Sequence, residues 1–222
     1  MSRKKLFLRD VIRIVLGLSV FALGVHLTIF ANIGLAPWDC LGTGIANHTP
    51  LNYGLAMTSV SVTILAIDLL LRERIGFGTC IDALLTGNLV QLFNDLNPLP
   101  LNTSVPLGAL LMAAGMAIMA VGMWIYMVPG RGCGPRDALL VGLGKLVRRV
   151  PIGAVQMALL ITVVAIGWLL GGPVGPGTLL FRALFGPEMQ MIYPWIGFEP
   201  RDVLHRSLSE DLAMLLGRTS DP

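Results

Sequence analysis

Charged residues are scarce in this chain of 222 residues. Asp, Glu, Lys and Arg together make up 13% of the sequence, whereas soluble domains usually contain roughly 25%. Hydrophobic residues account for 55%, and the mean hydropathy is +0.76. Several apolar runs are about 18–22 residues long, which is enough to cross a hydrocarbon core of roughly 30 Å. The composition therefore excludes a soluble globular domain and predicts an all-α, polytopic membrane protein.

Two further shortages narrow the class of protein. The apolar runs lack the period-two alternation of barrel strands, which excludes a transmembrane β-barrel. The three cysteines show no metal-ligand spacing and lie in or beside apolar segments, so we expect buried thiols without disulfides or a metal. They are Cys40, Cys80 and Cys133. The net charge of +3 is typical of basic cytoplasmic loops, so we expect neither a nucleic-acid partner nor a cofactor.

The sequence does contain a short stretch that occurs twice. Residues 34–41 read GLAPWDCL, and residues 132–139, 98 positions later, read GCGPRDAL. Each copy follows a long apolar run, which it breaks with Gly and Pro. Each then places an Asp in the first turn of the next predicted helix, because Pro is favoured at a helix start. The matching signature residues are Gly34, Pro37 and Asp39 in the first copy and Gly132, Pro135 and Asp137 in the second.

The repeat extends beyond this signature. The offset is 98 up to the signature helix and 99 after one inserted residue before Gly153. Further matches are Gly17, Ala22, Gly24, Leu41, Gly44, Thr63, Ala66, Ile67, Gly76, Gly78, Thr79, Gly87 and Gln91 with Gly115, Ala120, Gly122, Leu139, Gly142, Thr162, Ala165, Ile166, Gly175, Gly177, Thr178, Gly186 and Gln190. Such internal repeats decide the architecture. We therefore expect one membrane domain with an N-terminal repeat over residues 1–105, a C-terminal repeat over 106–198 and a cytoplasmic tail over 199–222.

Each repeat is predicted to contain three long apolar segments and one short helix, at residues 38–48 and 136–149. If every segment crosses the membrane, the two halves are parallel. If the short helix is re-entrant or broken, each half crosses three times and the halves are inverted. The inverted arrangement leaves the loop at 94–106, which has no basic residue, outside, and only Arg182 does not fit it. The charges that it places on the cytoplasmic side are those of Arg72, Arg74, Arg131, Arg136, Lys145, Arg148 and Arg149. Because basic residues favour that side, the sequence favours inverted repeats.

Asp39 and Asp137 are the leading candidates for a functional site. Inverted repeats with interrupted helices bind their ligands where the breaks meet near the midplane, and an intramembrane acid is costly unless it has a role. The two acids therefore line a central site for a cation, a proton or a polar group, or they only stabilise the starts of two short helices. Trp38 and Arg136 occupy matching positions beside them. Arg136 either neutralises Asp137 or binds an anionic substrate.

Other polar residues in apolar segments are weaker candidates. His26 either lines the site or bonds to a neighbouring helix. The matched Gln91 and Gln190 either line the site and hydrogen-bond across the interface between the halves, or make ordinary hydrogen bonds between neighbouring helices.

Two ion pairs are also expected from spacing and topology. Asp68 lies four residues before Arg72, which predicts a pair on one helix face. Arg182 is expected to pair with an acid such as Asp82 across the repeat interface, or to extend toward the membrane surface.

Four motifs carry a resemblance to a known family. They are GLAPWD at 34–39, GFGT at 76–79, GCGPRD at 132–137 and GGPVGPGT at 171–178, after a basic N-terminal start. Over about residues 10–195 the chain resembles the YczE/YitT-type family of uncharacterised bacterial integral membrane proteins. The family pattern usually has Gly where this chain has Ala36. The resemblance implies a multi-pass protein of the bacterial plasma membrane, and we expect both termini in the cytoplasm.

Three functions compete on the sequence. The inverted repeats and intramembrane acids favour a small-solute transporter or permease component. The expected partners are the lipid bilayer, an unknown small solute or ion, and a second copy of the chain in a homo-oligomer. The absence of a recognisable substrate motif favours a non-transporting scaffold or accessory protein. An intramembrane aspartyl enzyme is disfavoured, because no Gly-x-Gly-Asp, His-Glu-x-x-His or Gly-x-Ser-x-Gly motif occurs.

Overall fold

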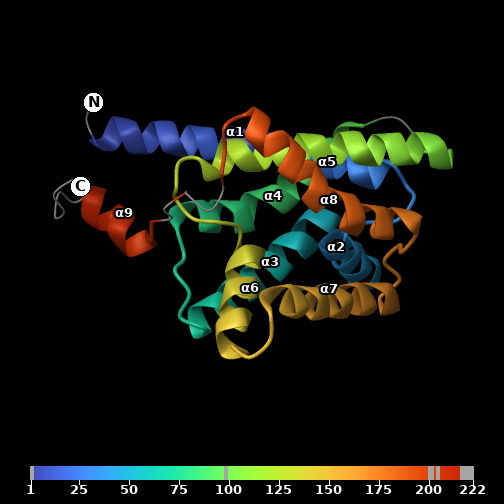
Figure 1. Ribbon diagram of the computed structural model, residues 1–222. Coiled ribbons are helices and arrows are strands. Elements are labelled where there is room, and N and C mark those ends of the chain that lie inside the picture. Colours follow the sequence, from blue (N-terminus) through green and yellow to red (C-terminus); the bar gives the residue numbers. More distant parts are fainter. Residues whose placement is uncertain (1–2, 98–99, 200–202, 204–205, 216–222) are drawn as a thin grey trace.

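The computed structural model describes residues 3–97, 100–199, 203 and 206–215, and within these ranges the secondary structure is helical (Figure 1). The helices are α1 (Arg3–Phe30), α2 (Pro37–His48), α3 (Tyr53–Leu70), α4 (Phe77–Leu96), α5 (Val105–Met127), α6 (Pro135–Leu146), α7 (Ile152–Leu169), α8 (Pro176–Trp195) and α9 (Leu208–Leu215). Among the described residues, four helices are long and apolar enough to cross a membrane, namely α1, α3, α5 and α7. The prediction of an all-α protein with several membrane spans is therefore confirmed.

The two longest apolar helices, α1 and α5, lie side by side and run antiparallel (Figure 1). A Cβ atom added to Gly24 would lie 2.6 Å from the carbonyl oxygen of Gly115, and one added to Gly122 would lie 2.9 Å from that of Gly17. The two backbones therefore touch, as small residues permit in membrane helix pairs. Because Gly17 matches Gly115 and Gly24 matches Gly122 in the repeat, the contact is reciprocal.

The short helices interlock the two halves. Helix α2 packs on α7, and its counterpart α6 packs on α3. Gly44 of α2 lies against Gly167 and Leu170, and Gly142 of α6 lies against Leu71. Leu71 and Leu170 are again matching positions at the offset of 99. Each half therefore completes the core of the other, and the two repeats share one packed unit.

The two signature elbows have the same backbone conformation. Gly34 has φ +116° and Gly132 has φ +117°, a region that side-chain-bearing residues rarely adopt. The amide of Gly177 donates to the carbonyl of Ile33 (2.7 Å), and the amide of Gly78 donates to that of Arg131 (2.7 Å). Each elbow is thus bonded to the first turn of α8 or α4 in the other half. This explains in physical terms why the repeat retains its glycines at these places.

The C-terminal region packs back onto the second elbow. The side chain of Arg131 is only 2% exposed. Its guanidinium pairs with Asp10 of α1 (Nη2–Oδ2 2.8 Å) and with Asp211 of α9, and it lies 4.9 Å from the ring centroid of Phe7. Arg131, which the sequence analysis counted only among the cytoplasmic charges, is therefore held by two buried acids from opposite ends of the chain. The rest of the predicted tail, at 200–202, 204–205 and 216–222, lies outside the described residues.

The predicted pair of Asp68 and Arg72 does not form. Helix α3 ends at Leu70, and Arg72 has φ +57°, so its side chain leaves the helix face that carries Asp68. Both carboxylate oxygens of Asp68 are buried without a hydrogen-bond partner in the described structure. The prediction was wrong because it extended the helix by one more turn.

Candidate functional site

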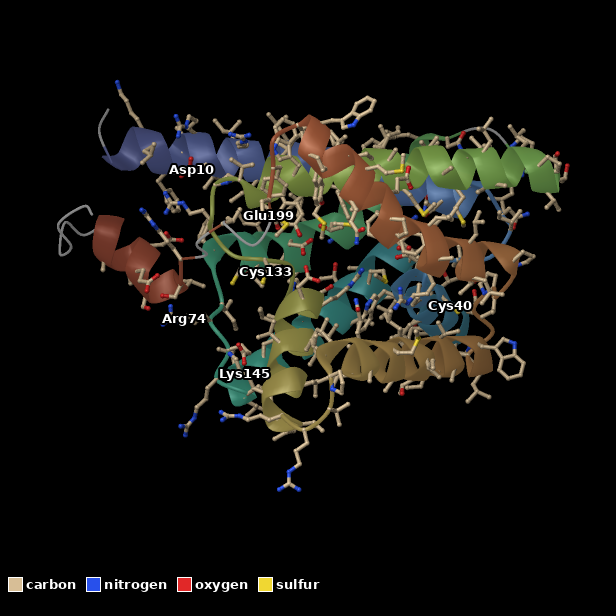
Figure 2. The ribbon with its side chains drawn as sticks, in the orientation of Figure 1. Asp10, Cys40, Arg74, Cys133, Lys145 and Glu199 are labelled. Carbon is tan, nitrogen blue, oxygen red and sulfur yellow. The ribbon has the colours of Figure 1, made fainter. Side chains whose placement is uncertain are left out.

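The two signatures meet at the centre of the fold. The Cζ atom of Arg136, at the start of α6, lies 5.3 Å from the ring centroid of Trp38, at the start of α2. This is a cation–π contact between matching positions of the two repeats. Cys133, in the second elbow, lies in the interior between α4 and α6 (Figure 2). The structure therefore places both elbows around one shared polar site.

Asp39 lies in the first turn of α2, as the sequence predicts, where a negative charge stabilises the start of a helix. It is 4% exposed and accepts a hydrogen bond from the hydroxyl of Tyr53 on α3 (2.9 Å). No side-chain hydrogen bond caps this first turn, which begins with Ala36 as the flanking residue and Pro37 as the first helical residue. The carboxylate of Asp39 joins α2 to α3 at the edge of the central site.

The second elbow brings two carboxylates together. A Cβ atom added to Gly134 would lie 3.0 Å from Oδ2 of Asp82, 3.6 Å from the hydroxyl of Tyr126 and 3.7 Å from Oδ2 of Asp137. Asp82, on α4, also accepts a hydrogen bond from the hydroxyl of Thr86. Asp137 is exposed, and Asp82 of α4 and Tyr126 of α5 lie near it. The accessible part of the site therefore lies beside Asp137.

The sequence analysis named Asp82 only as a partner for Arg182 and not as a candidate for the functional site. Its matching position in the second half is Phe181, so the repeat carries no signal for it. Only the general cost of an acid in an apolar segment could have identified it.

Three acids and one base define the electrostatics of this site, which we call the central acidic site: Asp39, Asp82, Asp137 and Arg136. The charge of Arg136 acts on all three carboxylates. If all four groups are ionised the site carries an excess of negative charge, which favours a proton or a cationic group. Within the described ranges, no three His, Cys, Asp or Glu side chains are gathered closely enough to hold a metal ion.

The remaining predicted residues lie in other contacts. Nδ1 of His26 is 2.6 Å from Oδ1 of Asn94, so the ring bridges α1 and the end of α4. The amide of Gly54 donates to Gln91 (3.3 Å), which in turn donates to Asp95 (2.7 Å). Gln190 is exposed on α8. Gln91 therefore makes an ordinary hydrogen bond between neighbouring helices of its own half, which is one of the two alternatives, and among the described residues it does not bond to Gln190.

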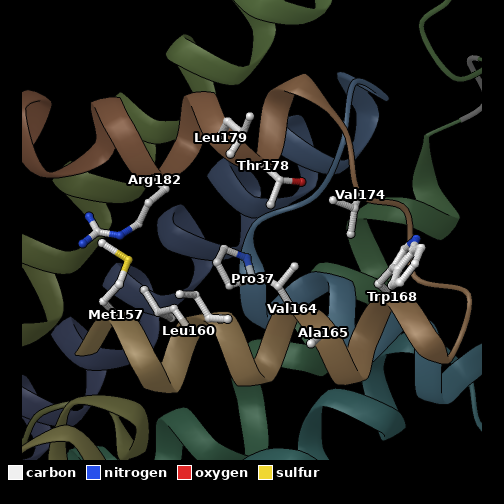
Figure 3. Close-up of a pocket in the computed structure, with 11 residues that line it drawn as sticks. Pro37, Met157, Leu160, Val164, Ala165, Trp168, Val174, Thr178, Leu179 and Arg182 are labelled. Atoms are coloured by element: carbon white, nitrogen blue, oxygen red, sulfur yellow. The ribbon is translucent and has the colours of Figure 1, made fainter. Parts of the chain in front are cut away.

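Arg182 does not pair with Asp82 either. It is exposed and lies at one end of a cavity of about 440 Å³ between α7 and α8 (Figure 3). Pro37 of the first elbow also lines this cavity. The cavity therefore lies directly beside the residues that lead into the central acidic site.

Comparison with known proteins identifies the family of this chain. The sequence matches one family over residues 8–194. The chain belongs to DUF6198, a family of unknown function. The likeness to YczE-type proteins that the motifs predicted is confirmed by the relatives below. No solved structure matches the chain.

Three bacterial relatives have similar lengths of matching sequence. An uncharacterized protein of Haemophilus influenzae is 29% identical over 173 residues, which cover 78% of each chain. The uncharacterized membrane protein YczE of Bacillus subtilis is 27% identical over 180 residues, covering 80% of this chain and 82% of YczE. The uncharacterized protein YyaS of the same organism is 28% identical over 183 residues, covering 81% and 90%. Together with the candidate spans, they identify a multi-pass membrane protein with bacterial relatives.

Proposed function

We propose that this protein is a plasma-membrane transporter for a small solute, without enzymatic activity, built from two inverted repeats around the central acidic site. The observation that carries the proposal is the contact between Arg136 and Trp38, because matching residues of two repeats can touch only where the repeats face each other. Secondary transporters place their binding sites at this kind of junction, between interrupted helices.

The reciprocal contacts support the inverted arrangement. The matched glycines of α1 and α5 meet in antiparallel helices, and each elbow bonds to the other half. Helices α4 and α8 contain 20 residues each, or about 30 Å at 1.5 Å per residue. Both can cross the bilayer if their polar side chains face protein. Three crossings then belong to each half, and α2 and α6 enter without crossing.

The position of charged residues supports cytoplasmic termini. Asp10 of α1, Arg74 and Lys145 lie toward the same end of the molecule as α9 (Figure 2). Lys145 of α6 pairs with Glu73 of the loop after α3 (2.6 Å). Basic residues concentrate on the cytoplasmic side of membrane proteins. We infer that this end faces the cytoplasm.

We infer different roles for the carboxylates. Asp137 is exposed and lies beside Asp82, so it is the group that an entering proton or cationic solute meets first. Asp39 accepts a hydrogen bond from Tyr53 and forms another side of the central acidic site. Arg136 balances part of the negative charge and keeps both signatures together through Trp38.

Proteoliposomes containing the full chain test this proposal. Charge movement is recorded on a solid-supported membrane after pH jumps and after addition of a panel of organic amines. We expect currents that fall by at least about tenfold in Asp137→Asn, since the variant loses a charge aimed at the solute. Asp95→Asn, which changes an exposed acid outside the central acidic site, serves as the matched control. Equal currents in the wild type and Asp137→Asn would contradict the proposal.

The close backbone contact of α1 and α5 favours a second candidate, a rigid membrane scaffold. A scaffold would give no pH-driven or solute-driven current in any variant, while every variant inserts and folds. The same recording therefore separates the two functions.

A further inference from the structure

The cavity between α7 and α8 has the form of a binding site rather than a packing defect. Its volume of about 440 Å³ falls within the roughly 300–1,000 Å³ of small-molecule pockets. Its walls are almost entirely aliphatic and aromatic, and include Leu160, Val164, Ala165 and Trp168 on α7. The close-up shows Trp168 at one end and Arg182 near the other, with Pro37 between them (Figure 3). The cavity is therefore a long apolar space with one charged end.

The two helices stand apart although their sequences allow close packing. A Cβ atom added to Gly153 of α7 or to Gly186 of α8 would meet no atom within 4 Å. At the matching positions of the other half, a Cβ atom added to Gly87 would lie 2.9 Å from the carbonyl oxygen of Gly54. The open space is therefore a property of this half alone. Something other than protein fills it in a bilayer, because an empty apolar cavity in contact with lipid is not maintained.

Arg182 supplies the chemistry that selects the occupant. It forms no ion pair with any residue that the structure describes, and it lies on a helix that we place within the membrane. An intramembrane arginine without an acid is costly and calls for a negative partner. Basic pockets between transmembrane helices bind lipid head groups. The apolar walls accept an acyl chain, and the guanidinium accepts an anionic group.

We propose that the α7–α8 cavity binds an anionic lipid of the bilayer, with an acyl chain along Leu160, Val164 and Ala165 and the acidic head group on Arg182. The proposal rests on the placement of α8 within the membrane, which belongs to the proposed function, but it does not depend on transport itself. Its link to the proposed transport is the shared residue Pro37, through which the occupant contacts the first elbow. In that role the lipid is either a bound regulator or the class of molecule that enters from the side.

Photolabelling in nanodiscs tests the proposal with the full-length chain. The probes are phosphatidylglycerol and phosphatidylcholine that carry the same diazirine acyl chain, and labelled peptides from residues 152–195 are quantified. We expect phosphatidylglycerol to label α7 and α8 about fivefold more strongly, since one basic residue contributes about 1 kcal/mol toward an anionic lipid. Arg182→Gln should reduce this preference to nearly one, and Arg182→Lys should retain most of it.

A second pair of variants tests the cavity rather than the charge. Ala165→Trp fills the space between the helices and should reduce labelling by both lipids. Ala154→Trp, at an exposed position of α7 outside the cavity, should leave labelling unchanged. Folding of every variant is checked by gel filtration.

Three outcomes overturn the proposal: equal labelling by the two lipids, no effect of Arg182→Gln and Ala165→Trp, or crosslinks from α7 and α8 to a second copy of the chain. Asp137→Asn should leave labelling unchanged. If the lipid labels the chain but no transport current is recorded, the transporter is refuted and the lipid site stands. If currents are recorded but the lipid does not label α7 and α8, only the lipid site is refuted.

Discussion

The two halves of this protein share a sequence pattern but pack it differently. In the first half, α3 and α4 touch through Gly54 and Gly87. In the second half, the matching Gly153 and Gly186 face open space, and a cavity separates α7 from α8. Glycine in a helix interior weakens the helix unless close approach needs it. If the protein is the transporter that we propose, we expect α7 and α8 to pack closely in another state of the protein.

This difference gives the proposed transport a structural basis. When inverted repeats exchange their conformations, access to a central site alternates between the two sides of the membrane. The closed pair α3 and α4 then shows how α7 and α8 meet when their cavity closes. The open pair shows how α3 and α4 separate. The lipid that we place beside Arg182 would favour the open state of the second half.

A second difference lies at the elbows. Arg131 in the second elbow is held by Asp10 and Asp211, and the matching residue in the first elbow is Ile33. Burial raises the pKa of the Asp211 carboxyl, and the Arg131 guanidinium opposes that shift. Ion pairs therefore stabilise the elbow at the end that carries α9, in addition to the packing and the backbone hydrogen bonds that hold both elbows.

The largest expected effect comes from breaking this charge pair. Arg131→Ile gives the second elbow the residue of the first and removes the buried partner of Asp10 and Asp211, so that Asp10 keeps only its longer contact with the exposed Arg9 (3.6 Å). We expect a loss of about 3–5 kcal/mol in the free energy of unfolding, the usual cost of removing one member of a buried pair. Equilibrium unfolding in mixed micelles measures it.

The matched control for this variant is Arg74→Gln. Arg74 is exposed, and surface substitutions usually change stability by less than about 0.5 kcal/mol. A loss for Arg131→Ile as small as that of the control would show that the second elbow does not depend on its ion pairs.

A smaller effect is expected where the halves are alike. Gly34→Ala and Gly132→Ala each force a side chain into a left-handed conformation. In Gly34→Ala the new Cβ atom would also lie 2.6 Å from the amide nitrogen of Gly175, and in Gly132→Ala it would lie 2.9 Å from Cα of Gly76. We expect both to lose about 1–3 kcal/mol of unfolding free energy in the same assay. A loss at only one elbow would contradict the equivalence of the two signatures.

The sequence predicted those features that both halves repeat. The glycines of α1 and α5, the two elbows and the short helices after them were identified because each appears twice at one offset. Their packing depends on the size of the residues at the contact. Because both repeats keep residues of the same size at these positions, the repeat itself indicates the contact. The approach of the two signatures to each other followed from the expected inversion, and the contact of Trp38 with Arg136 is its structural counterpart.

Features that occur in one half only could not be predicted in this way. Asp82 has Phe181 as its counterpart, and Arg131 has Ile33, so neither carried a repeat signal. The partners of Arg131 lie 121 and 80 residues away, and no local spacing connects them. Gln91 was considered for the interface because it matched Gln190, yet the tight pairing of α3 and α4 gave it a partner inside its own half.

The smallest expected effect is on the unfolding free energy of two matching Gly→Ala variants, which should change in opposite directions in the two halves. Ala favours a helix interior over Gly by about 0.5–1 kcal/mol. Gly186→Ala meets no atom within 4 Å, so we expect this gain in the unfolding free energy. Gly87→Ala gains the same helical preference, but its Cβ atom would lie 2.8 Å from Cβ of Met57, and we expect a net loss. A gain at both positions would show that α3 and α4 are as free to separate as α7 and α8, and a loss at both would show that α7 and α8 already pack closely in the membrane. Opposite signs would establish that one pattern of glycines is used in two packings at once, which is the asymmetry that alternating access needs.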